Sequence, residues 1–365
     1  MSHHHNIEVD ISFEDRYRVR VGQDVREALP SFCSQHYHPE KIIVIIDEKV
    51  DQLHHTKIQE ICDDYFREIL WLEVPRGERS KSLSQWQLMV DRILEEGVER
   101  GTPLLAVGGG VTGDLAGFVA ASTLRGIPLI HMPTTLLAMV DSSIGGKTGL
   151  NHPTGKNLVG AFYQPEAVFA DMAFLRTLEQ EEWITGMAEV IKYAAIRKPE
   201  LFDELTGLIK SIPEPDERWA NVISESVRIK TDIVEEDVLE AGNRAFLNFG
   251  HTFGHALEKV AGYGNLAHGE AVFAGMIAAT HFSRQLGHSV DDIRFSPFLP
   301  LYKRQIQSLP ADIGALIEAM RTDKKVKDNT IQLVLLKEWG SPYIQPCTDL
   351  SKLEESWQYA LAQFT

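Results

Sequence analysis

The chain has 365 residues, of which 44% are hydrophobic and 24% are charged, so it is long enough for about two domains with separate cores. It carries 36 basic and 52 acidic residues, and the net charge of −16 argues against binding to nucleic acids or anionic membranes. A small anionic ligand stays compatible with this charge, because one cleft can be locally basic. Three scattered cysteines argue against a disulfide framework. Without an apolar signal sequence or a run of about 20 apolar residues, we expect a soluble cytoplasmic protein.

The first half of the chain alternates strand-like and helix-like segments. Short apolar runs predict strands over 41–46, 68–74, 104–107 and 127–132, and apolar residues at helical spacing predict a helix over 82–99. Strands that alternate with helices are typical of a mostly parallel sheet with helices on both faces.

The second half is mainly helical. Its apolar spacing and its Pro and Gly residues predict helices over 183–197, 199–211, 217–236, 243–261, 268–286 and 351–363, with one late strand over 331–336. We therefore expect an α/β fold class, with an α/β domain over residues 1–178 and a mainly α-helical domain over 179–365. A cleft between two such domains is a preferred place for a ligand.

A glycine-rich turn follows the strand predicted over 104–107. Gly108, Gly110 and Gly113 have the G-x-G-x-x-G spacing that lets backbone N–H groups approach a pyrophosphate at the start of a helix. The acidic residue that usually follows about 20 positions later is absent, and Asp47, after an earlier strand, is the acid that could hold a ribose. The turn indicates a dinucleotide site, and a tight strand–helix turn without a ligand is the alternative.

A basic, hydroxyl-rich stretch occupies residues 133–157. It contains Lys147 and Lys156 among several Ser, Thr and Gly residues, on a chain that is otherwise acidic. Ammonium groups and neutral hydroxyl donors suit the recognition of phosphates and polyols. The stretch favours an anion site over a solvated loop.

A polar stripe runs along the helix predicted over 243–261. At 3.6 residues per turn, five polar side chains fall within a sector of roughly 80°: Arg244, Asn248, His251, His255 and Glu258. Aromatic residues take the opposite side of the helix, so the polar side is expected to line a site.

Two histidines of this stripe have the i, i+4 spacing of a zinc-binding pair, His251 and His255. His268, near the start of the next helix, and Glu189, on an otherwise apolar helix, are further candidate ligands. A catalytic metal usually takes three protein ligands, so one of the four is not a ligand. Spacing alone does not decide which one.

Several motifs, in this order, resemble the 3-dehydroquinate synthase family of sugar-phosphate cyclases over nearly the whole chain. They are GGGVTGDLAGFVAA, LRG, PTTLLAMVDSSIGGKTGLNHPTGKNLVGAF, GMAEVIKY, NFGHTFGHALE, HGEA and DKKVKD. The resemblance implies that a zinc or cobalt ion is held by Glu189, His251 and His268, and that His255 contacts the substrate.

The resemblance also implies roles for other residues. NAD is expected at Asp47, Glu78, Lys81, Gly108, Gly109, Gly110, Val111, Asp114, Thr134, Thr135, Lys147, Lys156, Thr177 and Glu182. Catalytic and substrate contacts are expected from Arg125, Asp141, Lys147, Asn157, Lys192, Lys230, Arg244, Asn248, His255 and Lys325. Of these, Arg125 is expected to reach the substrate phosphate of a neighbouring subunit in a homodimer.

The implied activity is that of a carbon–oxygen lyase of the shikimate pathway of aromatic amino-acid biosynthesis. It converts 3-deoxy-D-arabino-heptulosonate 7-phosphate to 3-dehydroquinate and phosphate by transient oxidation with NAD, β-elimination, re-reduction and aldol closure. A cyclase acting on sedoheptulose 7-phosphate, a metal-dependent polyol dehydrogenase and a non-catalytic scaffold are the alternatives. The cationic residues, and His255 in particular, favour a substrate that carries a carboxylate.

Overall fold

The computed structural model describes residues 7–12, 16–212, 214–237, 242–262, 265–306, 312–322, 326–327 and 330–365. Contacts between residues divide the chain into two compact units. The first comprises the described residues up to Trp183 together with Ser211–Thr231, and the second comprises Ile184–Lys210 and the described residues from Asp232 to the end. The boundary between residues 178 and 179 stays a prediction. Within the described residues, no helix is both long and apolar enough to cross a bilayer.

The first unit is built on a seven-stranded sheet, and its fold class confirms the prediction. Its strands run in the order β1 (Ile7–Ser12), β2 (Arg16–Gly22), β9 (Ala167–Asp171), β6 (Leu129–Pro133), β5 (Leu104–Gly108), β3 (Lys41–Asp47) and β4 (Glu68–Val74). Every neighbouring pair is parallel except β1 with β2. The predicted strands appear as β3, β4, β5 and β6, whereas β1, β2 and β9 were not predicted.

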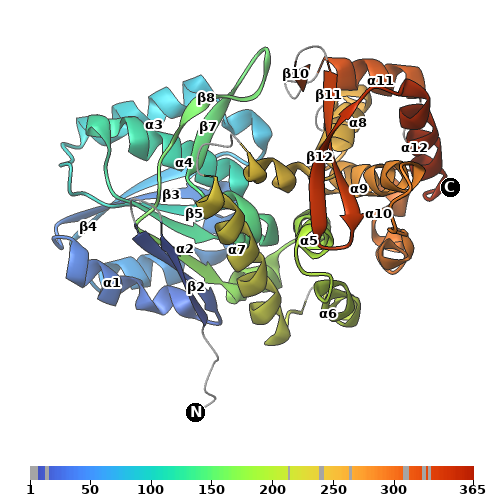
Figure 1. Ribbon diagram of the computed structural model, residues 1–365. Coiled ribbons are helices and arrows are strands. Elements are labelled where there is room, and N and C mark those ends of the chain that lie inside the picture. The colour runs from blue at the N-terminus through green and yellow to red at the C-terminus, as the bar shows by residue number, and fades with distance from the viewer. Residues whose placement is uncertain are drawn as a thin grey trace. The chain divides into compact units, whose positions relative to one another are not determined.

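Helices cover both faces of this sheet (Figure 1). They are α1 (Leu29–His36), α2 (Glu48–Asp63), α3 (Leu83–Glu95) and α4 (Gly110–Ser122). In Figure 1, α1 and α2 lie on one face of the sheet and α3 and α4 on the other. Ile43, Ile45 and Leu104 of the central strands pack with Ile93 and Leu115 in one buried cluster. Because these strands are buried on both faces, they read as continuous apolar runs in the sequence.

The stretch 133–157 and its continuation are more regular than a loop. A π-helical turn, η4 (Ala138–Ser142), is followed by an antiparallel hairpin of β7 (Lys147–His152) and β8 (Gly155–Phe162). The hairpin packs against α4 through a close approach, since a Cβ atom added to Gly117 would lie 2.4 Å from Cγ2 of Thr148. The polar side chains of this stretch are thus held by a π-turn and a hairpin.

Helices dominate the second unit. The helices that lie wholly in it are α6 (Leu201–Leu208), α8 (His251–Ala261), α9 (His268–Gln285), α10 (Leu299–Ile306), α11 (Ile313–Arg321) and α12 (Leu350–Ala362). The second unit also includes most of α5 (Gln180–Ile196) and the end of α7 (Arg218–Glu236). The late strand is present as β11 (Thr330–Glu338), but it is not alone. It pairs with β12 (Ser341–Cys347) and with β10 (Val326–Lys327) in a small antiparallel sheet.

The prediction of one helix over 243–261 is wrong. A 3-10 helix, η7 (Asn243–Asn248), ends before Gly250, which has φ = +79°, and α8 begins at His251. The positive φ interrupts helical geometry, so Arg244 and Asn248 do not share a helix face with the two histidines. The physical reason is a close approach: a Cβ atom added to Gly250 would lie 2.8 Å from the carbonyl oxygen of Val272 in α9.

Candidate active site

The glycine-rich turn joins β5 to α4 in the first unit. Strand β5 ends at Gly108, Gly109 precedes the helix, and α4 starts at Gly110. A Cβ atom on Gly108 would lie 2.6 Å from Cβ of Thr112, so the turn is too tight for a side chain there. The first N–H groups of a helix have no partner within that helix, and they suit an anion. Val111 lies in this first turn of α4. The arrangement is able to bind a pyrophosphate.

A buried ammonium group lies beside the turn. Lys81 donates hydrogen bonds to the carboxylate of Asp114 and to the side-chain oxygen of Asn157. Burial raises the pKa of Asp114, although Lys81 opposes that shift. Lys81 was expected at NAD together with Glu78, which accepts a hydrogen bond from Asn151 at 2.7 Å. Sequence reasoning did not anticipate that Lys81, Asp114 and Asn157 form one polar cluster.

A second polar pair joins η4 to α7, also in the first unit. Lys230 donates to the backbone oxygen of Asp141 at 2.6 Å and to its Oδ1 at 2.7 Å. Lys230 is buried, and the two residues are 89 positions apart in the chain. The structure thus brings together two residues that the resemblance assigned to the substrate.

The other residues predicted on the first unit are more dispersed. Asp47 caps α2 by accepting from the N–H groups of Lys49 and Val50, so it already has a structural role. Thr134 donates its N–H to the Gly108 carbonyl at 2.9 Å, which ties β6 to the turn.

The remaining members of the predicted set differ in exposure. Thr135, Lys156 and Glu182 are half-buried, whereas Arg125, Lys147 and Thr177 are exposed. Their roles in binding stay predictions.

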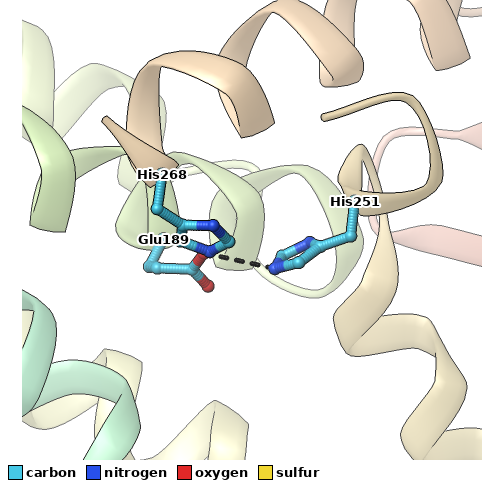
Figure 2. Close-up of side chains that lie close together, drawn as sticks. All are labelled: Glu189, His251 and His268. Atoms are coloured by element: carbon cyan, nitrogen blue, oxygen red, sulfur yellow. Dashed lines mark ion pairs between the residues drawn. The ribbon is translucent and has the colours of Figure 1, made fainter. Parts of the chain in front are cut away.

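Three candidate metal ligands converge in the second unit (Figure 2). Glu189 comes from α5, His251 is the first residue of α8, and His268 is the first residue of α9. Oε1 of Glu189 lies 3.6 Å from Nε2 of each histidine. The ligand atoms of the three residues all lie within 4.8 Å of one another. Two imidazole nitrogens and a carboxylate oxygen are a usual ligand set for a catalytic zinc-type ion.

The carboxylate of Glu189 is buried and ionised, as a ligand of a cation would be. Its side chain is 1% exposed, and Oε1 has no hydrogen-bond partner among the described residues, while Oε2 accepts a hydrogen bond from Lys192. Burial alone would raise the pKa of Glu189, but Lys192 and His268 outweigh it and hold the pKa at about 2. A buried anionic oxygen without a hydrogen bond fits a metal ligand, because such an atom is costly unless something binds it. The residues therefore fit a divalent metal.

The rest of the polar stripe lies on both sides of Gly250. His255 is half-buried on α8, with its ring centroid 5.6 Å from that of His251. Arg244 is buried in η7, where its backbone N–H donates a hydrogen bond to the carboxylate of Asp237 at 3.0 Å. Asn248 is half-buried in the same element. Lys325 lies outside the described residues.

A second possible ligand set shares one histidine with the first. His255, Glu258 and His268 also offer ligand atoms within 4.8 Å of one another. The sequence left open which of four side chains bind the metal, and the structure contains two candidate ligand sets that share His268. Glu258 was placed on the polar stripe without a role, and its spacing of seven from His251 is the signal that links the two.

Family models and individual relatives with similar sequences point to the same protein family. Residues 71–185 match the family model described as 3-dehydroquinate synthase N-terminal, and 186–326 match the one described as 3-dehydroquinate synthase C-terminal. The 3-dehydroquinate synthase of Salinibacter ruber is 44% identical over 325 residues, 88% of each chain. That of Streptococcus pneumoniae is 40% identical over 355 residues, 96% of each chain.

Solved structures with a similar fold include two synthases with NAD+ and a divalent metal ion bound. A 2-deoxy-scyllo-inosose synthase complexed with carbaglucose-6-phosphate, NAD+ and Co2+ has a TM-score of 0.85 at 26% identity, covering 96% of this chain and 99% of that one. A 2-epi-5-epi-valiolone synthase from Streptomyces hygroscopicus with NAD+ and Zn2+ bound has a TM-score of 0.84 at 26% identity, covering 97% and 99%. A glycerol dehydrogenase from Schizosaccharomyces pombe, at 13% identity and a TM-score of 0.61, shares the fold.

Proposed function

Since the chain belongs to the 3-dehydroquinate synthase family, we propose that it converts 3-deoxy-D-arabino-heptulosonate 7-phosphate to 3-dehydroquinate and phosphate. The observation that carries the proposal is the buried Oε1 of Glu189, which faces the Nε2 atoms of two histidines without a hydrogen-bond partner. A metal-binding group of this kind is what a metal-dependent cyclase requires, and a scaffold protein has no use for it.

Two cofactors follow from the proposal. The cyclases of similar structure carry NAD+ with Co2+ or Zn2+, and we assign NAD and one such divalent ion to this chain. Glu189, His251 and His268 would hold the ion, and the turn at Gly108–Gly110 would bind the pyrophosphate. When bound, NAD supplies a reversible hydride acceptor, and the metal supplies a Lewis acid for a hydroxyl group of the substrate.

The chain's own residues would bind and orient the substrate. The substrate carries a carboxylate and a phosphate, so several ammonium and guanidinium groups have anionic partners to bind. We assign this role to Lys147, Asn157, Lys192, Lys230, Arg244, Asn248, His255 and Lys325, with Asp141 orienting Lys230. Lys192 would also keep Glu189 ionised, because the two are in contact.

We further propose a cytoplasmic homodimer in which Arg125 acts across the subunit interface. Arg125 is exposed and has φ = +68°, next to Leu124 with φ = +50°. Two consecutive non-glycine residues with positive φ are strained, and strain of this kind clusters at functional sites.

A cyclase for sedoheptulose 7-phosphate is the second candidate, because the similar solved structures include other cyclases. His255 and the basic residues favour the carboxylate-bearing substrate. The higher identity to 3-dehydroquinate synthases, 40–44% against 26%, favours it as well. The polyol dehydrogenase has support from the fold alone.

The test is phosphate release from purified protein with catalytic NAD and zinc. The two sugar phosphates are supplied in parallel, and NADH is followed at the same time. We expect phosphate and 3-dehydroquinate from the heptulosonate phosphate only, without net NADH. Glu189→Gln is the matched control, because it keeps the shape of the side chain and removes the charged ligand. Activity on sedoheptulose 7-phosphate alone would assign the protein to the other cyclase class, and net NADH would indicate a dehydrogenase.

A further inference from the structure

The imidazole of His268 lies between two buried carboxylates. Its Nε2 is 3.6 Å from Oε1 of Glu189, and its Nδ1 is 3.7 Å from Oε2 of Glu258. Glu258 is 6% exposed and comes from α8, one helix away from His268 on α9. In a neutral histidine one ring nitrogen carries a proton and the other is free to bind a metal. An acceptor that faces one nitrogen keeps the proton there and leaves the other nitrogen free.

His251 has the same arrangement with a different acceptor. Its Nε2 faces Oε1 of Glu189 at 3.6 Å, and its Nδ1 lies 3.3 Å from the carbonyl oxygen of Phe249. Both histidines thus direct Nε2 toward the same carboxylate oxygen and Nδ1 toward an oxygen of the protein. Metal-binding histidines usually donate the other ring N–H to a carboxylate or a backbone carbonyl.

Helix packing explains how Glu258 reaches His268. Glu258 follows His251 by seven residues, so the two side chains project from α8 within about 20° of the same direction. Helices α8 and α9 approach so closely that a Cβ atom on Gly254 would lie 3.0 Å from the carbonyl carbon and oxygen of Ala271. This close crossing brings the second turn of α8 beside the first residue of α9.

We infer that Glu258 is a positioning residue of the metal site, which orients His268 through the contact between its carboxylate and Nδ1, 3.7 Å apart, and so presents Nε2 to the metal. The inference rests on the proposed function, since it requires a metal at Glu189, His251 and His268. It adds that Glu258 itself is not a ligand, although it belongs to the overlapping set with His255 and His268. The buried Oε1 of Glu189, without a hydrogen bond, favours the first set.

The test measures zinc affinity by competition with a chromogenic chelator, and the visible spectrum of the Co2+-loaded protein. We expect Glu258→Gln to weaken zinc binding by roughly 10-fold and Glu258→Ala by up to about 100-fold, the range that outer partners of metal ligands usually contribute. Gln keeps an oxygen that faces Nδ1 of His268 but lacks the charge, so it should rescue part of the loss. The Co2+ spectrum should shift clearly in Glu258→Ala and less in Glu258→Gln, because only the alanine variant leaves Nδ1 of His268 without an oxygen that faces it.

Three variants complete the design. Glu189→Gln should abolish zinc binding, and His255→Gln should leave it unchanged. Asp292→Asn is the matched control, because this half-buried carboxylate of the same unit accepts a hydrogen bond from Tyr359 and belongs to neither ligand set. It should alter neither the affinity nor the spectrum. Thermal unfolding of each variant reports whether it folds, and the near-isosteric Glu258→Gln keeps the test decisive if the alanine variant does not.

Wild-type zinc affinity and an unchanged Co2+ spectrum in Glu258→Gln and Glu258→Ala would overturn the inference and leave the proposed function in place. Loss of zinc in Glu258→Ala and His255→Gln, with binding retained in Glu189→Gln, would place the metal in the second set and also overturn it. A wild-type protein that binds no zinc would instead refute the proposed function, so the two failures are distinguishable.

Discussion

His131 is a buried histidine in β6, beneath the first turns of α4. Its Cε1 would lie 3.5 Å from a Cβ atom on Gly113. Burial lowers its pKa from 6.5 to about 4. At mildly acidic pH, His131 stays neutral in the folded protein and takes up a proton only when the chain unfolds. Its contribution to the free energy of unfolding is therefore present above pH 6.5 and is lost as the pH falls toward 4.

We therefore predict that His131→Gln makes stability less sensitive to acid. Between pH 7 and pH 5, the wild-type free energy of unfolding should fall by roughly 2 kcal/mol more than that of the variant, from the two pKa values. Urea unfolding at the two pH values measures the difference. Equal losses in the two proteins would contradict the assignment.

Lys192 is the buried counter-charge of Glu189. Removing one partner of a buried ion pair leaves the other charge uncompensated, which costs about 3–5 kcal/mol. We predict a loss of that order for metal-free Lys192→Met, and a smaller loss when zinc is present, because the metal replaces the missing positive charge. Chemical unfolding with a chelator and with zinc gives the comparison. A deficit that zinc does not reduce would show that the metal does not bind at Glu189.

At the scale of elements, the break between η7 and α8 depends on Gly250. An alanine there would combine a strained φ of +79° with contacts of 2.6 Å to Cγ of Met276 and 2.8 Å to a backbone oxygen. Gly287 is a matched control, because its φ is +88° but no atom lies within 4 Å of the added Cβ. The pair of variants separates backbone strain from steric overlap.

We predict that Gly287→Ala destabilises the protein by about 1–2 kcal/mol, the penalty of the left-handed conformation alone. Gly250→Ala should cost clearly more, about 3 kcal/mol or above, and should also weaken zinc binding, because His251 follows Gly250 directly. Thermal unfolding and zinc titration of both variants measure this. Similar losses in the two variants would mean that α8 and α9 move apart easily.

The extent to which the sequence predicts the fold depends on the kind of element. Strands β3, β5 and β6 were predictable, because burial on both faces makes them continuous apolar runs, and the edge strand β4 still has an apolar run over Ile69–Leu72. Strand β1 at the edge of the sheet and β2 beside it carry charged residues between their apolar ones, and β2 includes three arginines, so no apolar run marks them. The β7–β8 hairpin is rich in glycine and packs closely against α4, a contact that local pattern does not reveal.

The site shows the same division between local and distant information. The spacing of His251 and His255 is local and suggested a zinc-binding pair, whereas the structure places the two histidines in different candidate ligand sets. The spacing also suggested one continuous helix, because a glycine in a helical pattern carries no sign of a backbone oxygen from α9 nearby. The convergence of Glu189, His251 and His268 needs three helices to pack together, and only the resemblance to a family selected that set beforehand.

At the scale of the whole molecule, four cationic side chains are buried in a chain that is acidic overall. Lys81 and Lys230 are buried in the first unit, and Lys192 and Arg244 in the second, although the net charge is −16. Lys81, Lys192 and Lys230 are each held by a carboxylate of their own unit. The three lysines are therefore oriented by the protein itself.

The two cofactors should stabilise the protein independently, because their proposed residues lie in different units. A ligand that binds only the folded state stabilises it by about 2.7 kcal/mol at 100 times its Kd. We predict that Glu189→Gln loses the zinc-dependent rise in unfolding temperature and keeps the rise caused by NAD. Gly109→Val should do the reverse, since even a Cβ atom there would lie 3.0 Å from Cγ2 of Thr135. Each variant is the folding control of the other, because a response to one cofactor requires a folded protein. Loss of both responses in Glu189→Gln would show that NAD binding depends on the metal, and that the two sites are not independent.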